Sequence, residues 1–275
     1  MKAQKQKTNT GMKWNTIIGL FSTAIAGFAI FFFHYGFGLN DLLSLSFYEG
    51  LANPSVKIVQ VQEGLRKEEI AQIMADKLGW DESEKDQFIN AHLALNAKNL
   101  EGHYFPKTYL LMRGEDPFDV STTMFYEFSK QTETVAKTKQ AKIINPDTAL
   151  KIASIIQREA GGKSDMKLIS GIIWNRMFSG MKLQIDATLQ YAKGNEEDGW
   201  WKMVSPKDKS IDSPYNTYLY KDLPPSAIAN PGLAAIEAAY NPAKTSCLYY
   251  MHDKNRKIHC ATTYAEHKRN IDKYY

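Results

Sequence analysis

One glutamate, Glu159, stands where a sequence can prepare a carboxyl group for acid catalysis. At about 100° per residue, Glu159 falls on the same helical arc as Ile152, Ile155 and Ile156 in the run ASIIQREAGG. A carboxyl group among apolar side chains loses hydration of its charged form, which raises its pKa toward the range where it donates a proton at neutral pH. The pattern therefore predicts a general acid. The alternative is an exposed glutamate at a frayed helix end, paired with Arg158 or a lysine.

A second group of polar residues follows in the segment MKLQIDATLQYAKG. Gln184, Asp186 and Thr188 occupy alternate positions, and in an extended chain alternate side chains point to the same side. Asp186 is equally suited to cap a short helix from Ala187 to Lys193. The two roles of Asp186 are compatible, so this segment predicts a polar wall for a ligand site, a helix cap, or both.

The helix that carries Glu159 is well delimited in the sequence. Asn145 can cap its start, Pro146 suits its first position, Asp147 favours the positive end of the helix dipole, and Gly161 can end it. Around it, periodicity predicts an α+β chain. The expected elements are a strand at 56–61, helices at 66–78, 82–95, 119–139, 164–178 and 233–240, a hairpin at 247–263, and a helix from 264 onward.

Two irregular segments are rich in aromatic residues. LEGHYFPKTYLL combines the carboxylate of Glu101 with rings around Pro106, which could serve as a platform for sugar rings or simply form a hydrophobic loop and strand. Residues 213–232 concentrate proline, tyrosine and asparagine, a composition typical of an ordered lid or the lining of a ligand groove.

The N-terminus carries the signal of a membrane anchor. Residues 14–35 contain no Asp, Glu, Lys or Arg, and about 20 apolar residues span a bilayer core as a helix. Four lysines precede this span, and the first charged residues after it are acidic, so the N-terminus is expected in the cytoplasm. We expect a cytoplasmic tail at 1–13, a single transmembrane helix at 14–35 and a linker at 36–55, with the body outside the cytoplasmic membrane. The alternative is a cleaved signal peptide, whose apolar core is usually shorter.

Composition and cysteine spacing argue against several other classes of protein. Lys+Arg 34 against Asp+Glu 30 gives a net charge of +4 with no basic stripe, which does not favour nucleic-acid binding. No CxxC or HExxH spacing is present, so we expect neither a metal site nor a cofactor. Cys247 and Cys260 would lie diagonally on one face of the expected hairpin, at about 7 Å, and we expect them to be free thiols.

Four stretches, in order, resemble one protein family. They are LEGHYFPKTY, ASIIQREAG, NRMFSGMKLQIDATLQYA and SPYNTYLYKDLPPSAIANPGLAAIEAAYNPAKTSCLYY, and together they are similar to the YceG-like endolytic murein transglycosylases over residues 56–275. The resemblance implies a small LysM-like module at 56–100 and an α+β YceG-like catalytic domain at 101–275. It also implies that the catalytic acid of the family corresponds to Glu159.

The resemblance implies cleavage of the β-1,4 bond between N-acetylmuramic acid and N-acetylglucosamine within peptidoglycan strands. If the C6 hydroxyl of the sugar attacks the anomeric carbon, one glutamate suffices as acid and then base, and the product ends in 1,6-anhydromuramic acid. The expected partners are glycan strands and the peptidoglycan synthases whose nascent strands the enzyme would terminate.

Six further residues are candidates for binding sugar hydroxyls and acetamides or for shaping the groove. They are Asn175, Gln184, Asp186, Thr188, Tyr215 and Asn216. Two other functions stay open at this point. The first is a glycoside hydrolase that pairs Glu159 with Asp186 or Glu101, because ordinary glycosidases use two carboxylates. The second is a membrane-tethered scaffold that binds peptidoglycan without cleaving it.

Overall fold

The computed structural model describes residues 27–37, 41, 44–93 and 99–274. The chain divides into two compact units, Met1–Pro54 and Ser55–Tyr275. In the first unit residues 27–35 are helical, and α3 spans Leu45–Ala52. No helix within the described residues is long and apolar enough to cross a membrane. Residues 1–26, which include the expected tail and more than half of the expected transmembrane helix, lie outside the described residues.

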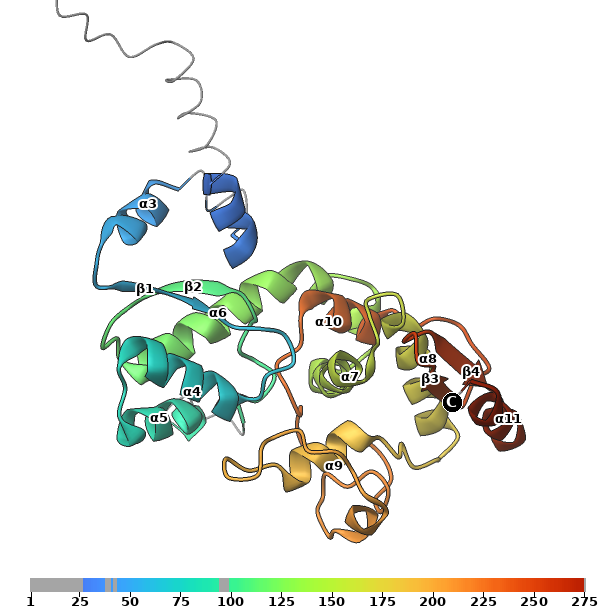
Figure 1. Cartoon of the computed structure of the whole chain (residues 1–275). Helices are drawn as coiled ribbons and strands as arrows, with labels where there is room; N and C mark the ends of the chain where they lie inside the picture. Colours follow the sequence, from blue (N-terminus) through green and yellow to red (C-terminus); the bar gives the residue numbers. More distant parts are fainter. Residues whose placement is uncertain (1–26, 38–40, 42–43, 94–98, 275) are drawn as a thin grey trace, which may run out of the picture. The chain divides into compact units, whose positions relative to one another are not determined.

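The second unit is α+β, as predicted, and Figure 1 shows its elements in order along the chain. They are β1 (Val56–Gln60), α4 (Lys67–Leu78), α5 (Glu82–Ile89), β2 (Thr108–Met112), α6 (Pro117–Ala136), α7 (Pro146–Glu159), α8 (Met166–Phe178), α9 (Asp186–Lys193), α10 (Leu233–Tyr240), β3 (Tyr249–His252), β4 (Ile258–Ala261) and α11 (Tyr264–Tyr274). Short 3-10 turns occupy Ala91–Leu93, Gln140–Lys142 and Pro206–Ser210.

A first hydrophobic core lies between a two-stranded sheet and three helices. Strands β1 and β2 pair antiparallel, with Val56 opposite Met112, and α4, α5 and the start of α6 contribute buried side chains. The aromatic segment around Pro106 belongs to this core. Tyr104 is fully buried with its hydroxyl 2.8 Å from that of Ser121, and the Tyr109 hydroxyl donates to a backbone carbonyl. The rings of Tyr104 and Tyr109 are therefore part of a hydrophobic loop and strand and are not available as a sugar platform.

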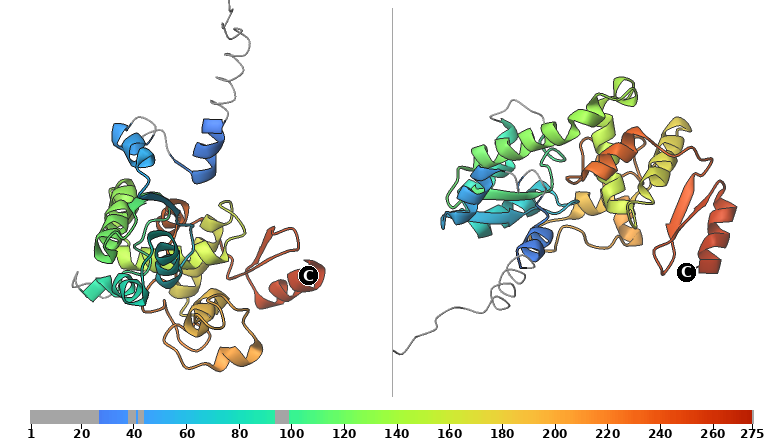
Figure 2. Two further views of the ribbon diagram at one scale, coloured as in Figure 1. Left: turned by 60° about the vertical axis from the view of Figure 1, so that its left-hand side comes forward. Right: turned by 90° about the horizontal axis from the view of Figure 1, so that it is seen from above.

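Helix α6 connects this core to a second one. Val120 and Met124 lie in the first core, whereas Val135, nearer the end of the helix, lies in the second. Figure 2 shows the helix extending from the β1–β2 sheet to α10. One continuous helix thus ties the two cores together.

Helix α7 lies in the second core, packed against α8 and α10. The Asn145 side chain accepts the N–H of Asp147 at 2.9 Å, which confirms the predicted cap. Ile152, Ile155 and Ile156 are fully buried, as their spacing predicts. The opposite arc is covered too, because the buried Ser154 hydroxyl accepts the N–H of Ile228 at 3.0 Å. These contacts fix the helix that ends at Glu159.

The C-terminal hairpin differs from the prediction at its cysteines. Cys247 and Cys260 form a disulfide, with their Cα atoms 5.9 Å apart, so the expectation of free thiols was wrong. Tyr249 pairs with Ala261, yet the N–H of Leu248 also donates to the Ala261 carbonyl, which places two residues opposite one. Such a bulge increases the local twist of a hairpin. A flat diagonal geometry therefore overestimated the distance between the cysteines.

Candidate active site

Glu159 is the last residue of α7, and its side chain lines an open pocket of about 490 Å³. The chain leaves the helix in an extended conformation at Ala160. At Gly161 a Cβ atom would lie 2.9 Å from the Asp165 carboxylate and 3.0 Å from a backbone carbonyl, so this close passage needs glycine. The end of α7 and the close passage at Gly161 therefore fix where the Glu159 side chain enters the pocket.

Two hydrogen bonds hold the Glu159 carboxyl group. The Tyr250 hydroxyl donates to Oε2 at 2.7 Å, and the Ala187 N–H donates to Oε1 at 3.4 Å. Arg158 points away from this carboxyl group and donates to the Gly64 carbonyl at 3.2 Å. The exposed glutamate paired with Arg158, which the sequence left open, is therefore not the arrangement found.

Burial raises the pKa of the Glu159 carboxyl above its ordinary value. The hydrogen bonds from Tyr250 and Ala187 act in the opposite direction because they stabilise the charged form, and the nearby charge of Asp186 raises the pKa further. The net direction is upward. A carboxyl group with this balance is protonated over a wider pH range and can act as a general acid.

Asp186 and Gln184 lie in the same pocket as Glu159. Asp186 is exposed and accepts the Tyr218 hydroxyl at 2.5 Å. It is the first residue of α9 rather than its cap, because the cap position is Ile185 and no side chain bonds there. The predicted cap was therefore wrong. Gln184 is exposed with a φ of 53°, a left-handed conformation that is uncommon for residues other than glycine.

Thr188 does not point to the side that alternation predicted. The chain becomes helical at Asp186, so Thr188 turns into the core, where its buried hydroxyl donates to the Ile185 carbonyl at 2.8 Å. The extended stretch expected through these three residues was wrong at its C-terminal end. A part for Thr188 in binding substrate stays a prediction, and its observed bond holds the start of α9.

Asn175, Tyr215 and Asn216 do not line the pocket. The Asn175 amide donates to the carbonyls of Thr245 and Cys247, and the buried Asn216 amide donates to two carbonyls in the preceding loop. The Tyr215 hydroxyl lies 2.7 Å from that of Ser226. Their part in substrate binding stays a prediction, and in the structure they order the chain around the pocket.

The sequence reasoning missed three residues that line the pocket with Glu159. Tyr250 and His252 come from β3, where His252 Nε2 lies 3.1 Å from the Asp165 carboxylate. Arg176 of α8 donates to the Leu248 carbonyl at 2.6 Å and to carbonyls of residues 182 and 183. Arg176 therefore joins the hairpin to the segment before Asp186, and a periodic pattern carries no signal for such bonds.

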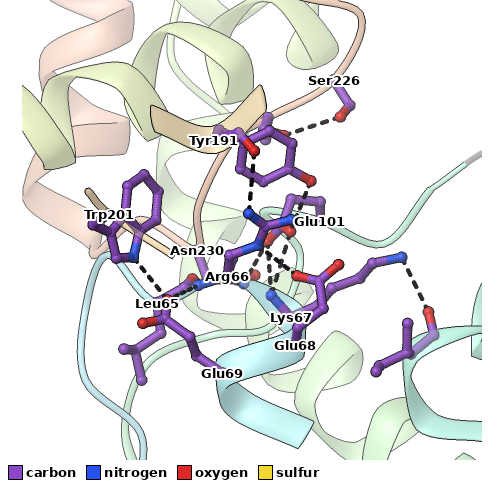
Figure 3. Close-up of polar contacts among 12 residues, drawn as sticks. Leu65, Arg66, Lys67, Glu68, Glu69, Glu101, Tyr191, Trp201, Ser226 and Asn230 are labelled. Atoms are coloured by element: carbon purple, nitrogen blue, oxygen red, sulfur yellow. Dashed lines mark hydrogen bonds and ion pairs between the residues drawn. The ribbon is translucent and has the colours of Figure 1, made fainter. Parts of the chain in front are cut away.

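Glu101, the other candidate for a second carboxylate, belongs to a different cluster (Figure 3). It is buried, is not among the residues that line the Glu159 pocket, and accepts the Lys67 N–H, the Asn230 amide and the Tyr191 hydroxyl. Burial raises the pKa of Glu101 to about 8. Through these contacts the buried Glu101 side chain connects the start of α4 to α9.

The sequence and the fold identify the family of this chain. The model of the YceG-like family matches residues 40–273. The chain belongs to the YceG-like family. Within the part of the chain that the structure describes, no group of three or more His, Cys, Asp or Glu residues could hold a metal ion.

Curated relatives and a solved structure agree with this assignment. The endolytic murein transglycosylase of Bacillus subtilis (strain 168) is 30% identical over 270 residues, which cover 90% of this chain and 74% of that protein. The endolytic murein transglycosylase of Streptococcus pneumoniae serotype 2 is 31% identical over 175 residues, 62% of this chain and 32% of that longer protein. A crystal structure of a yceG-like protein from Listeria monocytogenes has a TM-score of 0.68 at 26% identity, and covers 84% of this chain and 81% of its own.

Proposed function

We propose that this YceG-like protein is an endolytic peptidoglycan lytic transglycosylase with Glu159 as its catalytic acid and base. The observation that carries the proposal is the position of Glu159, at a helix end in an open pocket, with a raised pKa and hydrogen bonds from Tyr250 and Ala187. The names of the curated relatives support the same activity.

In this mechanism Glu159 first donates its proton to the oxygen of the β-1,4 bond as that bond breaks. The carboxylate that results is stabilised by the Tyr250 hydroxyl and the Ala187 N–H, which already point at its two oxygens. The C6 hydroxyl of the N-acetylmuramic acid then attacks the anomeric carbon and returns a proton to Glu159. The product is a 1,6-anhydromuramyl end, and the enzyme is regenerated without water entering the reaction.

A hydrolase is the second candidate, because Asp186 lies in the same pocket. Its carboxylate could act as base for a water molecule, as the second carboxylate of ordinary glycosidases does. Two features favour the transglycosylase: Asp186 already accepts the Tyr218 hydroxyl, and Glu101 does not line the pocket.

Substitution of the acid tests the proposal. Glu159→Gln fills the same space but cannot donate the proton, so cleavage of glycan strands should fall by roughly 10²- to 10⁴-fold. Asp186→Asn is the matched control and should retain most of the activity. If Asp186→Asn is as inactive as Glu159→Gln with the fold intact, the hydrolase becomes the better account.

We further propose that residues 14–35 anchor the enzyme in the cytoplasmic membrane, with residues 36–275 outside, and that it terminates nascent strands beside peptidoglycan synthases. The uncharged span and the lysines before it support the anchor. Protease added to intact spheroplasts should remove the body of the protein, and protection of that body would contradict this topology.

We also propose that the region from residue 56 to 100 contributes to a LysM-like module that binds glycan. The order β1–α4–α5–β2, with two helices between paired antiparallel strands, supports a small module of this kind. Strand β2 lies beyond residue 100, so the module would need the segment up to Met112 for its sheet.

A further inference from the structure

Three aromatic side chains in contact with one another line the same pocket as Glu159. They are Tyr249 of β3 and Tyr264 and His267 of α11. The rings of Tyr249 and His267 are stacked, with centroids 5.5 Å apart and an interplanar angle of 22°. The Tyr264 ring lies 5.9 Å from Tyr249 and 6.3 Å from His267. We call these three residues the aromatic wall.

Contacts within the protein hold the aromatic wall in place. The Arg176 guanidinium lies over the Tyr249 ring, 5.0 Å from its centroid, and the same guanidinium is held by backbone carbonyls. His267 Nδ1 is buried and makes no hydrogen bond within the protein, and burial lowers the pKa of His267, which favours the neutral ring. The three rings are therefore uncharged, with the Arg176 guanidinium beside them in the same pocket.

One member of the wall, Tyr264, is 61% exposed. An exposed aromatic ring that lines a pocket keeps an apolar face uncovered beside the pocket's polar groups. Other pocket residues are polar, including Gln184, Asp186 and Lys209. An apolar ring face together with nearby polar groups fits a pyranose, which has an apolar face and hydroxyl groups around its edge.

We propose that Tyr264, supported by Tyr249 and His267, forms a saccharide subsite that stacks on a pyranose ring in the pocket of Glu159. This inference rests on the proposed function, because it names where the strand lies in the same pocket. The wall and the acid are linked through consecutive residues of β3: Tyr249 belongs to the wall, and Tyr250 donates to Glu159. Consecutive strand residues point to opposite faces, yet Tyr249 and Tyr250 both line the Glu159 pocket.

Binding by the inactive full-length chain, in detergent, tests the subsite. In the Glu159→Gln background, calorimetry with a tetrasaccharide of alternating N-acetylglucosamine and N-acetylmuramic acid measures Kd without cleavage. Tyr264→Ala should weaken binding about 5- to 10-fold, whereas Tyr264→Phe, which keeps the ring, should bind like the parent. The matched control is Tyr126→Ala, because Tyr126 is 68% exposed on α6 and does not line the pocket.

Each outcome decides the inference. Unchanged affinity in Tyr264→Ala, or equal losses in Tyr264→Ala and Tyr126→Ala, would overturn the subsite. Equal losses in Tyr264→Ala and Tyr264→Phe would mean that the hydroxyl, and not the ring face, makes the contact, and would also overturn it. If the wild-type enzyme cleaves strands but Tyr264→Ala binds normally, the subsite alone fails. If the wild type yields no anhydro ends yet the ring dependence of binding is found, the proposed chemistry alone fails.

Discussion

At the scale of single residues, the reactivity of Glu159 depends on neighbours that move its pKa in opposite directions. The acid must be protonated to react, so activity should be lost as pH rises through its pKa. Tyr250→Phe removes a hydrogen bond to the charged form of Glu159. This should raise the pKa of Glu159 and move the alkaline limb of the pH profile to higher pH. Asp186→Asn removes a nearby negative charge, which should lower the pKa of Glu159 and move the alkaline limb to lower pH.

The pH dependence of kcat/KM for the two variants checks this prediction. Tyr250→Phe should also be slower at its optimum, by about tenfold, because the carboxylate that forms in the reaction loses a donor. Asp186→Asn keeps an oxygen that can accept the Tyr218 hydroxyl, so it serves as the structurally conservative partner. Shifts in the same direction would show that the pKa of Glu159 does not control the limb.

Glu101 leads to a prediction about stability. Its pKa is raised to about 8 in the folded protein, so between about pH 4.5 and 8 the folded state binds more protons than the unfolded state. Stability should therefore fall as pH rises through this range, by at most about 1.4 kcal/mol per pH unit from this group. Glu101→Gln imitates the protonated form, since its amide can donate to Tyr191, and should flatten the dependence.

Denaturant unfolding of the wild type and of Glu101→Gln at several pH values measures this effect. Glu101→Gln should gain stability relative to the wild type as pH rises toward 8. A constant difference between the two proteins across this range would show that Glu101 does not take up a proton on folding.

Residue-scale prediction from the sequence succeeded where local periodicity carries the information. The spacing of Ile152, Ile155 and Ile156 placed Glu159 at the edge of the core because the helix determines that face by itself. Tyr250 was missed because its contact with Glu159 spans 91 positions, and no local pattern encodes such a pairing. Thr188 was misplaced because the helix starts at Asp186, two residues before the extended chain was expected to end.

At the scale of elements, the β3–β4 hairpin supplies Tyr250 to the site and is closed by the Cys247–Cys260 disulfide. Loss of the disulfide should destabilise the hairpin by about 2 to 3 kcal/mol for a loop of this size. It should also weaken the hydrogen bond from Tyr250 to Glu159. We expect lower activity in the variant Cys247→Ser/Cys260→Ser, with the second core still folded.

Activity with and without a thiol reductant checks this prediction. The wild type should lose activity on reduction, while the double serine variant should be low in both conditions and insensitive to the reductant. Equal activity of reduced and oxidised wild type would mean that the hairpin holds Tyr250 in place without the disulfide.

Most elements could be predicted from helix caps and from the spacing of apolar residues, and the exceptions have physical causes. The cap at Asn145 and the periodic helices are local features, so their positions were found. The disulfide was not, because the bulge opposite Ala261 changes the twist of the hairpin and a sequence does not specify a bulge through alternation alone. The β1–β2 pairing joins strands about 50 residues apart, and it too lies beyond local patterns.

At the scale of the whole molecule, the chain behaves as two compact units, with a boundary at Pro54 and Ser55. Both hydrophobic cores lie within residues 55–275, and α6 connects them. Removal of residues 1–54 should therefore leave a protein that folds without detergent and retains the pocket.

Thermal unfolding and cleavage assays of the truncated protein check this expectation. One cooperative transition and near-normal cleavage of soluble glycan strands are expected. Aggregation without a transition would show that the first unit is required for the fold of the second.

The measurement that tests the central claim most directly is mass spectrometry of glycan strands digested by the wild-type protein, with Glu159→Gln as the matched control. A single carboxyl group acting as acid and then base predicts new ends that carry 1,6-anhydro-N-acetylmuramic acid, and their absence in the Glu159→Gln digest. New ends with a free reducing sugar would show that water is the nucleophile and that a second carboxylate takes part, and intact strands in the wild-type digest would contradict the enzymatic account altogether.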